Sequence, residues 1–299
     1  MNKVLKAHLA LLTANLIYSG SFIIAKEVMP NYIRPFGFVV IRVAGATILY
    51  WLIHAIFIKE KVDKKHLPKL LLLAIFGVAT NQLLFLKGLN ITTPINAAIM
   101  MITTPILVLI ISAIILKEKV SILNITGILL GFIGAASLLL IKSDFSFGSE
   151  TFYGDLFVFI NALSWGIYLV LVKPFMKLYN TVTILKWVFL FGFFIVLPFG
   201  YDQVAAINIT SFTPIIWLFV LYVVITTTVI AYLLNTYALK ELSSSVVSAY
   251  IYLQPILAAI IALAAEKDKL HPVKIISAGL IFIGVYLASK KVNTIKKTK

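Results

Sequence analysis

Long apolar runs alternate with short polar gaps along the whole chain. We identify ten runs, whose boundaries are marked by Lys, Pro, Gly and Asp. The first five lie near residues 8–28, 36–58, 67–89, 95–116 and 122–141, and the second five near 154–172, 182–200, 214–235, 244–265 and 272–289. A helix that crosses a bilayer needs about 20 predominantly apolar residues. The pattern therefore predicts an all-α integral membrane protein with ten transmembrane helices.

Composition narrows the class of protein further. Of the 299 residues, 61% are hydrophobic and only 12% are charged. A water-soluble chain of this length needs a larger polar surface, so an ordinary cytosolic enzyme and a disordered chain are both excluded. The chain has no cysteine, so it is not a secreted disulfide scaffold and cannot form a thiolate metal site.

The charge balance predicts orientation rather than a nucleic-acid partner. The formal net charge is +15, but the basic residues lie in short gaps between apolar runs. Such a placement is typical of residues that set topology at anionic lipid surfaces. If the amino terminus is inside, the inner segments hold eighteen basic residues and the outer segments seven. We therefore expect a multi-pass protein of the cell (inner) membrane with both termini in the cytoplasm.

The second half of the chain repeats the first. Residues 104–119 match residues 254–269 at an offset of 150, which pairs Pro105 with Pro255 and Glu118 with Asp268. Shared proline, acidic and lysine positions at one offset are unlike a chance match between two apolar helices. Each half contains an odd number of runs, so the second half enters the membrane in the opposite direction. Inverted-topology repeats of this kind recur in secondary transporters.

The repeat also divides the chain. We expect a first five-helix repeat over 1–142, an extracytoplasmic linker over 143–153, a second five-helix repeat over 154–291 and a basic cytoplasmic tail over 292–299.

These features resemble the EamA branch of the drug/metabolite transporter superfamily over nearly the whole chain. The pattern that carries the resemblance is Pro105, then Glu118 between two lysines, then Gly127 and Gly134. The second copy departs from it mildly, with an Asp where Glu is usual and Ser277 where Gly is usual. The resemblance implies a ten-helix carrier that exports or exchanges substrates, with a central cavity lined mainly by the first, third, fourth, sixth, eighth and ninth helices. It does not name a substrate.

Uncharged polar and aromatic residues form stripes on those helices. In chain order, the candidate cavity residues are Asn15, Ser19, Asn81, Gln82, Met100, Thr104, Asn161, Trp165, Tyr168, Tyr232, Asn235, Tyr250 and Gln254. An amide without a partner in hydrocarbon costs several kcal/mol, so these groups face protein or a wet cavity. For any single amide, a hydrogen bond that only holds two helices together is an equal alternative.

Three further positions have specific candidate roles. Arg42 is a candidate anion contact, with an interfacial arginine that snorkels to lipid headgroups or pairs with a loop acid as the favoured alternative. Pro105 and Pro255 are candidate hinges, with a static kink as the alternative. A glycine face on the fifth helix has two interpretations, packing within the chain and a homodimer interface, of which packing is favoured.

Enzyme interpretations find little support, because no catalytic, nucleotide-binding or metal-binding motif is present. We expect no enzymatic activity, no cofactor and no bound metal. The favoured function is a secondary transporter that moves small metabolites by alternating access. No carboxylate lies in the middle of a predicted helix, which favours neutral or zwitterionic solutes, amino acids above all, over lipophilic cations. The alternative is a polytopic membrane protein without transport activity, such as a sensor or an assembly partner.

Overall fold

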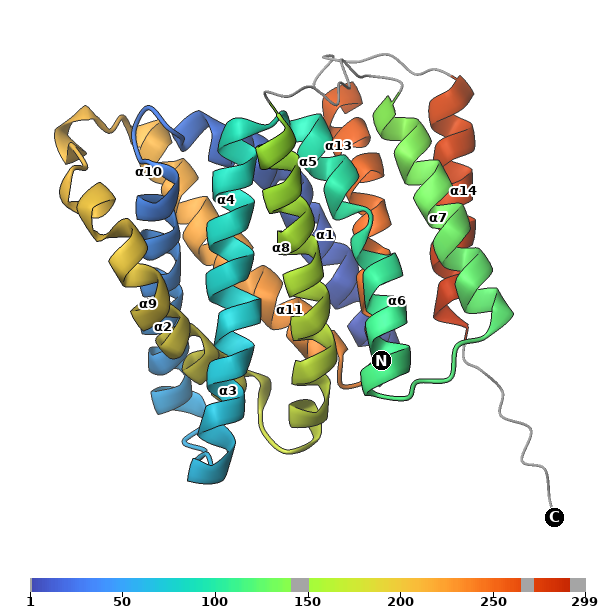
Figure 1. Ribbon diagram of the computed structural model, residues 1–299, viewed down its shortest axis with the longest axis horizontal. Coiled ribbons are helices and arrows are strands. Elements are labelled where there is room, and N and C mark those ends of the chain that lie inside the picture. Colours follow the sequence, from blue (N-terminus) through green and yellow to red (C-terminus); the bar gives the residue numbers. More distant parts are fainter. Residues whose placement is uncertain (1, 141–150, 265–271, 291–299) are drawn as a thin grey trace.

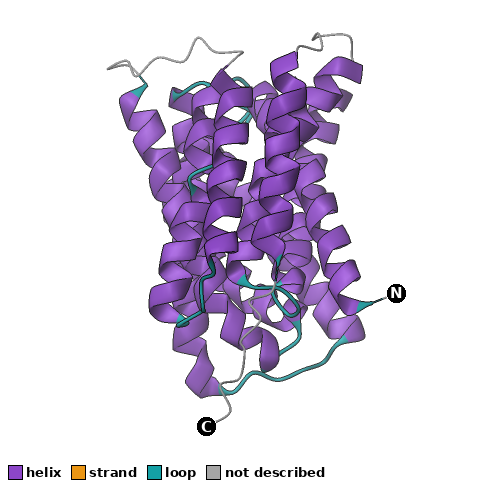
Figure 2. Cartoon of the chain, turned by 90° about the vertical axis from the view of Figure 1, so that its right-hand side faces the viewer, coloured by secondary structure: helices purple, strands orange, loops and turns teal. Residues whose placement is uncertain are grey.

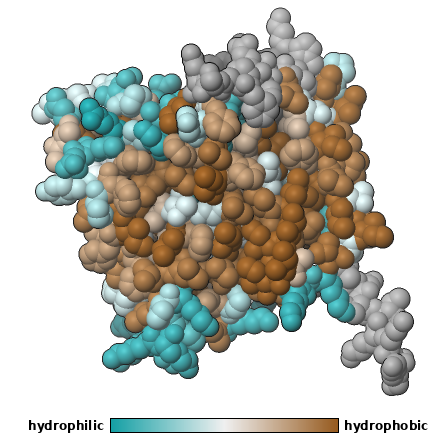
Figure 3. Space-filling model, viewed as in Figure 1, coloured by the Kyte–Doolittle hydropathy of each residue, from teal (hydrophilic) through white to brown (hydrophobic). Residues whose placement is uncertain are grey.

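The described residues of the protein, 2–140, 151–264 and 272–290 of a computed structural model, form helices joined by short loops (Figures 1 and 2). The surface in Figure 3 has an apolar belt between two hydrophilic ends. Within the described residues, seven helical segments are long and apolar enough to cross a membrane. Two shorter apolar helices lie at Ile122–Ser137 and Ile275–Ser289. These features define an all-helical, multi-pass membrane protein.

The first half contains seven α-helices and two irregular helical segments within the described residues. In chain order they are α1 (Lys3–Val28), α2 (Pro35–Phe57), η1 (Lys64–His66), α3 (Leu67–Ala74), η2 (Ile75–Thr80), α4 (Asn81–Ile91), α5 (Pro94–Met101), α6 (Thr104–Ile115) and α7 (Ile122–Leu140).

The second half follows a similar order. Its elements are α8 (Phe152–Val172), η3 (Lys173–Lys177), α9 (Thr181–Ala205), η4 (Ile209–Ser211), α10 (Pro214–Leu221), η5 (Tyr222–Ile230), α11 (Ala231–Ala238), α12 (Ser244–Ala249), η6 (Tyr250–Tyr252), α13 (Leu253–Ala264) and α14 (Pro272–Ser289).

Side-chain caps mark where several helices begin. Asn180 Oδ1 accepts a hydrogen bond from the Val182 amide at 3.0 Å, and the Ser243 hydroxyl oxygen accepts from the Val246 amide at 3.2 Å. A first-turn amide has no partner within its own helix, so a short oxygen-bearing side chain at the N-cap stabilises the start. These caps place the beginnings of α9 and α12 at fixed residues in the loops.

Two long apolar segments are not continuous α-helices. The π-helix η2 separates α3 from α4, and the π-helix η5 separates α10 from α11. The predicted spans near 67–89 and 214–235 are present as helical segments, and the π-helices inside them were not predicted. Short π-helical insertions in α-helices are frequent at functional sites. They occur here at matching places in the two halves.

The two candidate hinge prolines begin helices rather than kink them. Pro105 lies in the first turn of α6, after a break that follows α5. Pro255 lies in the first turn of α13, directly after the 3₁₀ turn η6. A proline at this position removes an amide that would have no helical partner in any case. The chain is thus irregular directly before each proline, and the hinge role of both residues stays a prediction.

The glycines of α7 pack against α14 of the same chain. A Cβ atom added to Gly127 would lie 2.6 Å from the Gly284 carbonyl oxygen, and one added to Gly134 would lie 2.8 Å from the Ser277 carbonyl oxygen. Neither position has room for a side chain. This glycine face is occupied within the chain, as the favoured interpretation of the sequence predicted, and is not free to form a homodimer.

Candidate functional site

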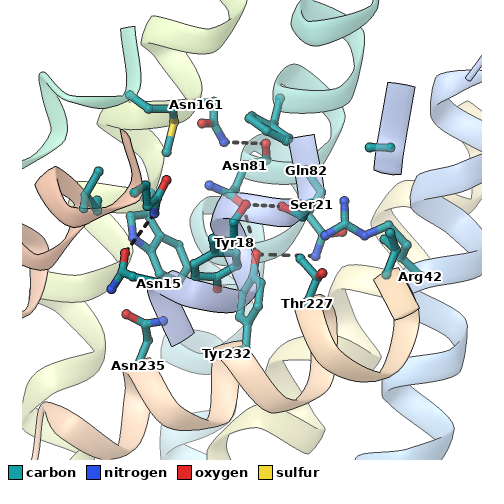
Figure 4. A pocket seen from close by; sticks show the side chains of 17 residues that line it. Asn15, Tyr18, Ser21, Arg42, Asn81, Gln82, Asn161, Thr227, Tyr232 and Asn235 are labelled. Atoms are coloured by element: carbon teal, nitrogen blue, oxygen red, sulfur yellow. Dashed lines mark hydrogen bonds between the residues drawn. The ribbon is translucent and has the colours of Figure 1, made fainter. Parts of the chain in front are cut away.

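A pocket lined by polar and apolar groups receives side chains from both halves of the chain (Figure 4). Its lining residues come from α1, α2, α4, α5, α8, η5, α11, η6 and α13: Asn15, Tyr18, Ser21, Ala25, Arg42, Asn81, Gln82, Phe85, Met101, Asn161, Trp165, Val223, Thr227, Tyr232, Asn235, Ile251 and Gln254. Its volume is about 80 Å³. One water needs roughly 10–15 Å³ on the same measure, so the pocket has room for several waters or part of a small solute.

The Tyr232 hydroxyl connects the two halves at the pocket. Its oxygen lies 2.9 Å from Asn81 Oδ1 and 3.0 Å from the Gly77 carbonyl oxygen, and it accepts a bond from Gln82 Nε2 at 3.4 Å. Gly77 belongs to the π-helix η2, directly before α4. Tyr232 follows the matching π-helix η5 of the other half. The hydroxyl thus joins α11 of the second half to η2 and α4 of the first.

Two further amides cross between the halves. Asn161 Nδ2 of α8 donates to the Asn81 carbonyl oxygen of α4 at 2.7 Å. Gln254 Nε2 of α13 donates to Asn15 Oδ1 of α1 at 2.9 Å. Buried amides are costly without partners, so these bonds both stabilise the helix contacts and orient the amides at the pocket wall.

Some polar atoms of the pocket wall have no partner. Gln82 Oε1, Asn161 Oδ1 and Thr227 Oγ1 are buried and make no hydrogen bond among the described residues. An unsatisfied buried acceptor costs about 1–3 kcal/mol.

An aromatic layer adjoins the pocket through Trp165 and Tyr232, which line it. Its ring centroids form a chain: Tyr50 lies 5.2 Å from Phe189, Phe189 lies 5.2 Å from Tyr232, Tyr232 lies 5.2 Å from Trp165, and Trp165 lies 5.1 Å from Tyr168. Such spacings are favourable for tilted and offset aromatic pairs. Along α2 and α8, the layer's residues lie further than the pocket residues toward the end of the molecule at which α1 begins.

Arg42 reaches the pocket from α2. It is 6% exposed, and its Nε donates to Thr228 Oγ1 of η5 at 3.0 Å. The Thr228 hydroxyl in turn donates to the Val223 carbonyl oxygen at 2.7 Å. The favoured alternative from the sequence, an arginine that snorkels to lipid headgroups, was wrong because the guanidinium is directed into the protein (Figure 4).

The structure brings together a majority of the predicted cavity residues. Those that line the pocket are Asn15, Asn81, Gln82, Asn161, Trp165, Tyr232, Asn235 and Gln254. Asn235 Nδ2 donates to the Ala231 carbonyl oxygen at 2.9 Å, within its own helix.

The other five predicted residues lie outside the pocket lining. The hydroxyls of Ser19 and Thr104 donate to the Leu16 and Met101 carbonyl oxygens of neighbouring turns, each at 2.7 Å. Tyr168 bonds to Thr236 at 3.1 Å within the aromatic layer, and Tyr250 bonds to His8 at 2.7 Å. Met100 packs against the apolar core. Local carbonyls and neighbouring side chains thus satisfy these groups.

Several pocket residues were missed by the sequence interpretation. On α1, the face that meets the pocket runs through Asn15, Tyr18, Ser21 and Ala25. The spacing of three or four residues marks one helical face, but the neighbouring face through Ser19 carries the same signal. The remaining missed positions are Phe85, Met101, Val223, Thr227 and Ile251. Phe85 follows Asn81 by one helical turn, which was an available signal.

This architecture, a pocket between two similar halves of a helical membrane protein, is that of a transporter. The sequence pattern of the EamA-like transporter family matches residues 5–140 and 152–290. The chain belongs to this family, which lies in the drug/metabolite transporter superfamily, as the resemblance predicted.

Its relatives carry transporter names. An uncharacterized transporter of Archaeoglobus fulgidus is 28% identical, over 96% of this chain and 98% of the relative. The uncharacterized transporter YyaM of Bacillus subtilis is 27% identical over 96% and 94%. A WAT1-related protein of Arabidopsis thaliana is 25% identical over 62% and 58%. A solved crystal structure has the same fold, with a TM-score of 0.77, 18% identity and coverage of 95% and 96%. The family points to membrane transport of a small molecule and away from enzymatic catalysis.

Proposed function

We propose that this protein is a secondary transporter that moves small metabolites by alternating access. The observation that carries the proposal is the pocket between the halves, whose wall combines side chains from both. Small-molecule sites are concave and largely apolar with a few placed polar groups, and this pocket has that composition.

The proposed architecture is ten transmembrane helices in two inverted repeats, divided as 1–142, 143–153, 154–291 and 292–299. Two features support it. The π-helices η2 and η5 occupy matching places in the halves, and the matching helices α1 and α8 run in opposite directions in Figure 1. Inverted halves can expose a shared site to either side of the membrane in turn.

We further propose that the protein lies in the inner membrane of the cell and that both of its termini are in the cytoplasm. The first turn of α1 and the last turn of α14 lie at the same end of the molecule, which supports the proposal (Figure 1). Because the chain has no cysteine, single-cysteine variants can test it. Thr210→Cys should react with an impermeant thiol reagent from outside and Lys64→Cys should not. The reverse labelling would show the orientation to be wrong.

The proposed substrates are neutral or zwitterionic, with amino acids as the favoured class and export or exchange as the favoured mode. No Asp or Glu lines the described pocket, so a lipophilic cation would be poorly compensated there. An export-deficient host that expresses the chain should gain resistance to toxic amino-acid analogues. Resistance to quaternary ammonium dyes alone would contradict this substrate class.

Transport itself can be tested by blocking the pocket. Counterflow of labelled amino acids is measured in proteoliposomes for Ser21→Trp, which fills the pocket, and for the matched control Ile23→Trp, whose position is 62% exposed on the same helix. We expect at least about a tenfold loss of flux for the first variant and wild-type flux for the second. Equal flux in both variants, with equal protein levels, would place the substrate path elsewhere.

A further inference from the structure

A buried positive charge without a counter-ion lies in the pocket. Arg42 uses its Nε to bond Thr228, and its two terminal nitrogens have no hydrogen-bond partner among the described residues. Thr228 fixes the direction of the guanidinium, because its hydroxyl hydrogen is already donated to a carbonyl oxygen of the π-helix and its oxygen is left to accept. The two terminal nitrogens of the guanidinium are therefore free to donate hydrogen bonds to a ligand.

No carboxylate of the described chain balances this charge. The ion pairs among the described residues join Lys65 to Asp63 and Lys173 to Glu118. The buried Asp155 is held by Thr92 and Asn96 instead. An arginine stays protonated in proteins, and a buried charge without a partner costs several kcal/mol. An anionic group on a ligand would therefore stabilise the charge of Arg42.

The other wall of the pocket carries hydrogen-bond acceptors rather than donors. Gln82 and Asn161 line the pocket, and their amide oxygens Oε1 and Oδ1 are acceptors without donors among the described residues. Both oxygens are enclosed by protein, so each amide must turn toward the pocket to accept from a ligand. In Figure 4, Arg42 enters from one side and Asn15 lies on the other, with Gln82 and Tyr232 between them. A ligand with an anionic end and a donor end would satisfy both walls at once.

We propose that Arg42 binds the carboxylate of an α-amino acid and that the orphan amide oxygens of Gln82 and Asn161 accept from its ammonium group. The inference rests on the proposed transport function and names the group that the site recognises. Guanidinium and carboxylate form two parallel hydrogen bonds, a geometry that a lysine ammonium cannot reproduce. The ring of Trp165 and the side chains of Val223 and Ile251 belong to the apolar part of the wall, which would face the side chain of the amino acid.

The anion site also spans the two halves. Arg42 belongs to α2 of the first half, and Thr228 belongs to η5 of the second. A bound carboxylate on Arg42 therefore stabilises the arrangement of halves in which Thr228 holds the guanidinium. Thr228 is a positioning residue, because it acts on the ligand through Arg42.

The test measures binding to the purified full-length protein in detergent. The probes are L-phenylalanine and L-leucine, each compared with its amide, with the amine that lacks the carboxylate and with the acid that lacks the amino group. We expect the amino acids to bind, the amides and amines to bind at least about 30-fold more weakly, and the acids without an amino group to be intermediate. Equal binding of an amino acid and its amide would overturn the inference.

Variants assign the carboxylate contact to Arg42. Arg42→Gln should lose at least about 30-fold in affinity for the amino acids and little for the amides, and Arg42→Lys should recover only part of the loss. The matched control is Lys186→Gln, which removes the other buried cation; Lys186 lies against His54 and Trp51, outside the pocket lining. The control should bind as the wild type does. Thr228→Val should weaken binding of amino acids more than of amides.

Stability without ligand distinguishes a binding residue from a structural one. Because Arg42→Gln removes an uncompensated charge, its melting temperature without ligand should equal or exceed that of the wild type. A large fall would show that the arginine has an ion partner within the fold and would overturn the inference. If Arg42→Gln moves amino acids as well as the wild type does, the transport function stands and the anion site falls. If the wild type moves neither amino acids nor carboxylate-free solutes, the proposed function falls.

Discussion

The α7–α14 pair and the pocket between the halves are both helix interfaces inside the bundle, but they are built in opposite ways. In the pair, glycines allow backbone to touch backbone, and Gly284 and Gly127 each leave no room for a Cβ atom. Around the pocket, large side chains such as Trp165 and Tyr232 keep helices apart, and amides bond to backbone carbonyls. The first interface has no space for a solute, and the second has both space and unsatisfied polar atoms. Side-chain size thus separates a static contact from a candidate binding site.

The largest loss of stability is expected in the α7–α14 pair, where the backbones leave no room for a side chain. Gly127→Leu places a side chain against the backbone of α14, where the Gly284 carbonyl oxygen lies 2.6 Å from the added Cβ position. Overpacking against backbone cannot be relieved by a rotamer change, so we expect a loss of at least about 3 kcal/mol in unfolding free energy.

Thermal unfolding in detergent measures this effect. The matched control is Gly279→Leu on α14, where no atom lies within 4 Å of an added Cβ. The control should melt within a few degrees of the wild type. Equal melting temperatures for both variants would show that α7 and α14 do not pack as closely as described.

An intermediate effect is expected at the pocket. Tyr232→Phe keeps the ring and removes the hydroxyl that contacts Asn81, Gln82 and the Gly77 carbonyl. Buried groups then lose their partner, which predicts a loss of about 1–3 kcal/mol in stability together with reduced flux. The control Tyr286→Phe removes a hydroxyl from a side chain that is 63% exposed and should change neither quantity. Wild-type stability in Tyr232→Phe would mean that the hydrogen bonds of the Tyr232 hydroxyl do not hold the helices together.

The smallest effect is expected at a helix start beside the pocket. Pro105→Ala replaces a first-turn proline of α6, so its stability cost should stay below about 1 kcal/mol. Ala135→Pro tests the opposite case, because Ala135 is fully buried inside the continuous helix α7. A proline there removes a backbone bond and clashes with the preceding turn, at a cost of about 3 kcal/mol or more. A similar cost for both variants would restore Pro105 to the role of a kink in a continuous helix.

Some of the site could be predicted from sequence because polar residues are rare in the apolar runs. Asn81, Gln82 and Asn161 stood out for that reason. The errors arose where two faces of one helix carry equal signals. Ser19 and Ser21 differ by two residues, and only the packing of α1 decides that Ser21 meets the pocket.

The sequence by itself determined the membrane class, the two similar halves and the family. These depend on the length of apolar runs and on the spacing of Pro, Gly and charged residues, which are properties of the chain order. Tertiary structure alone decided the π-helices, the partner of the α7 glycines and the burial of Arg42. Each of these depends on which helix lies opposite, and a pattern within one helix does not contain that information.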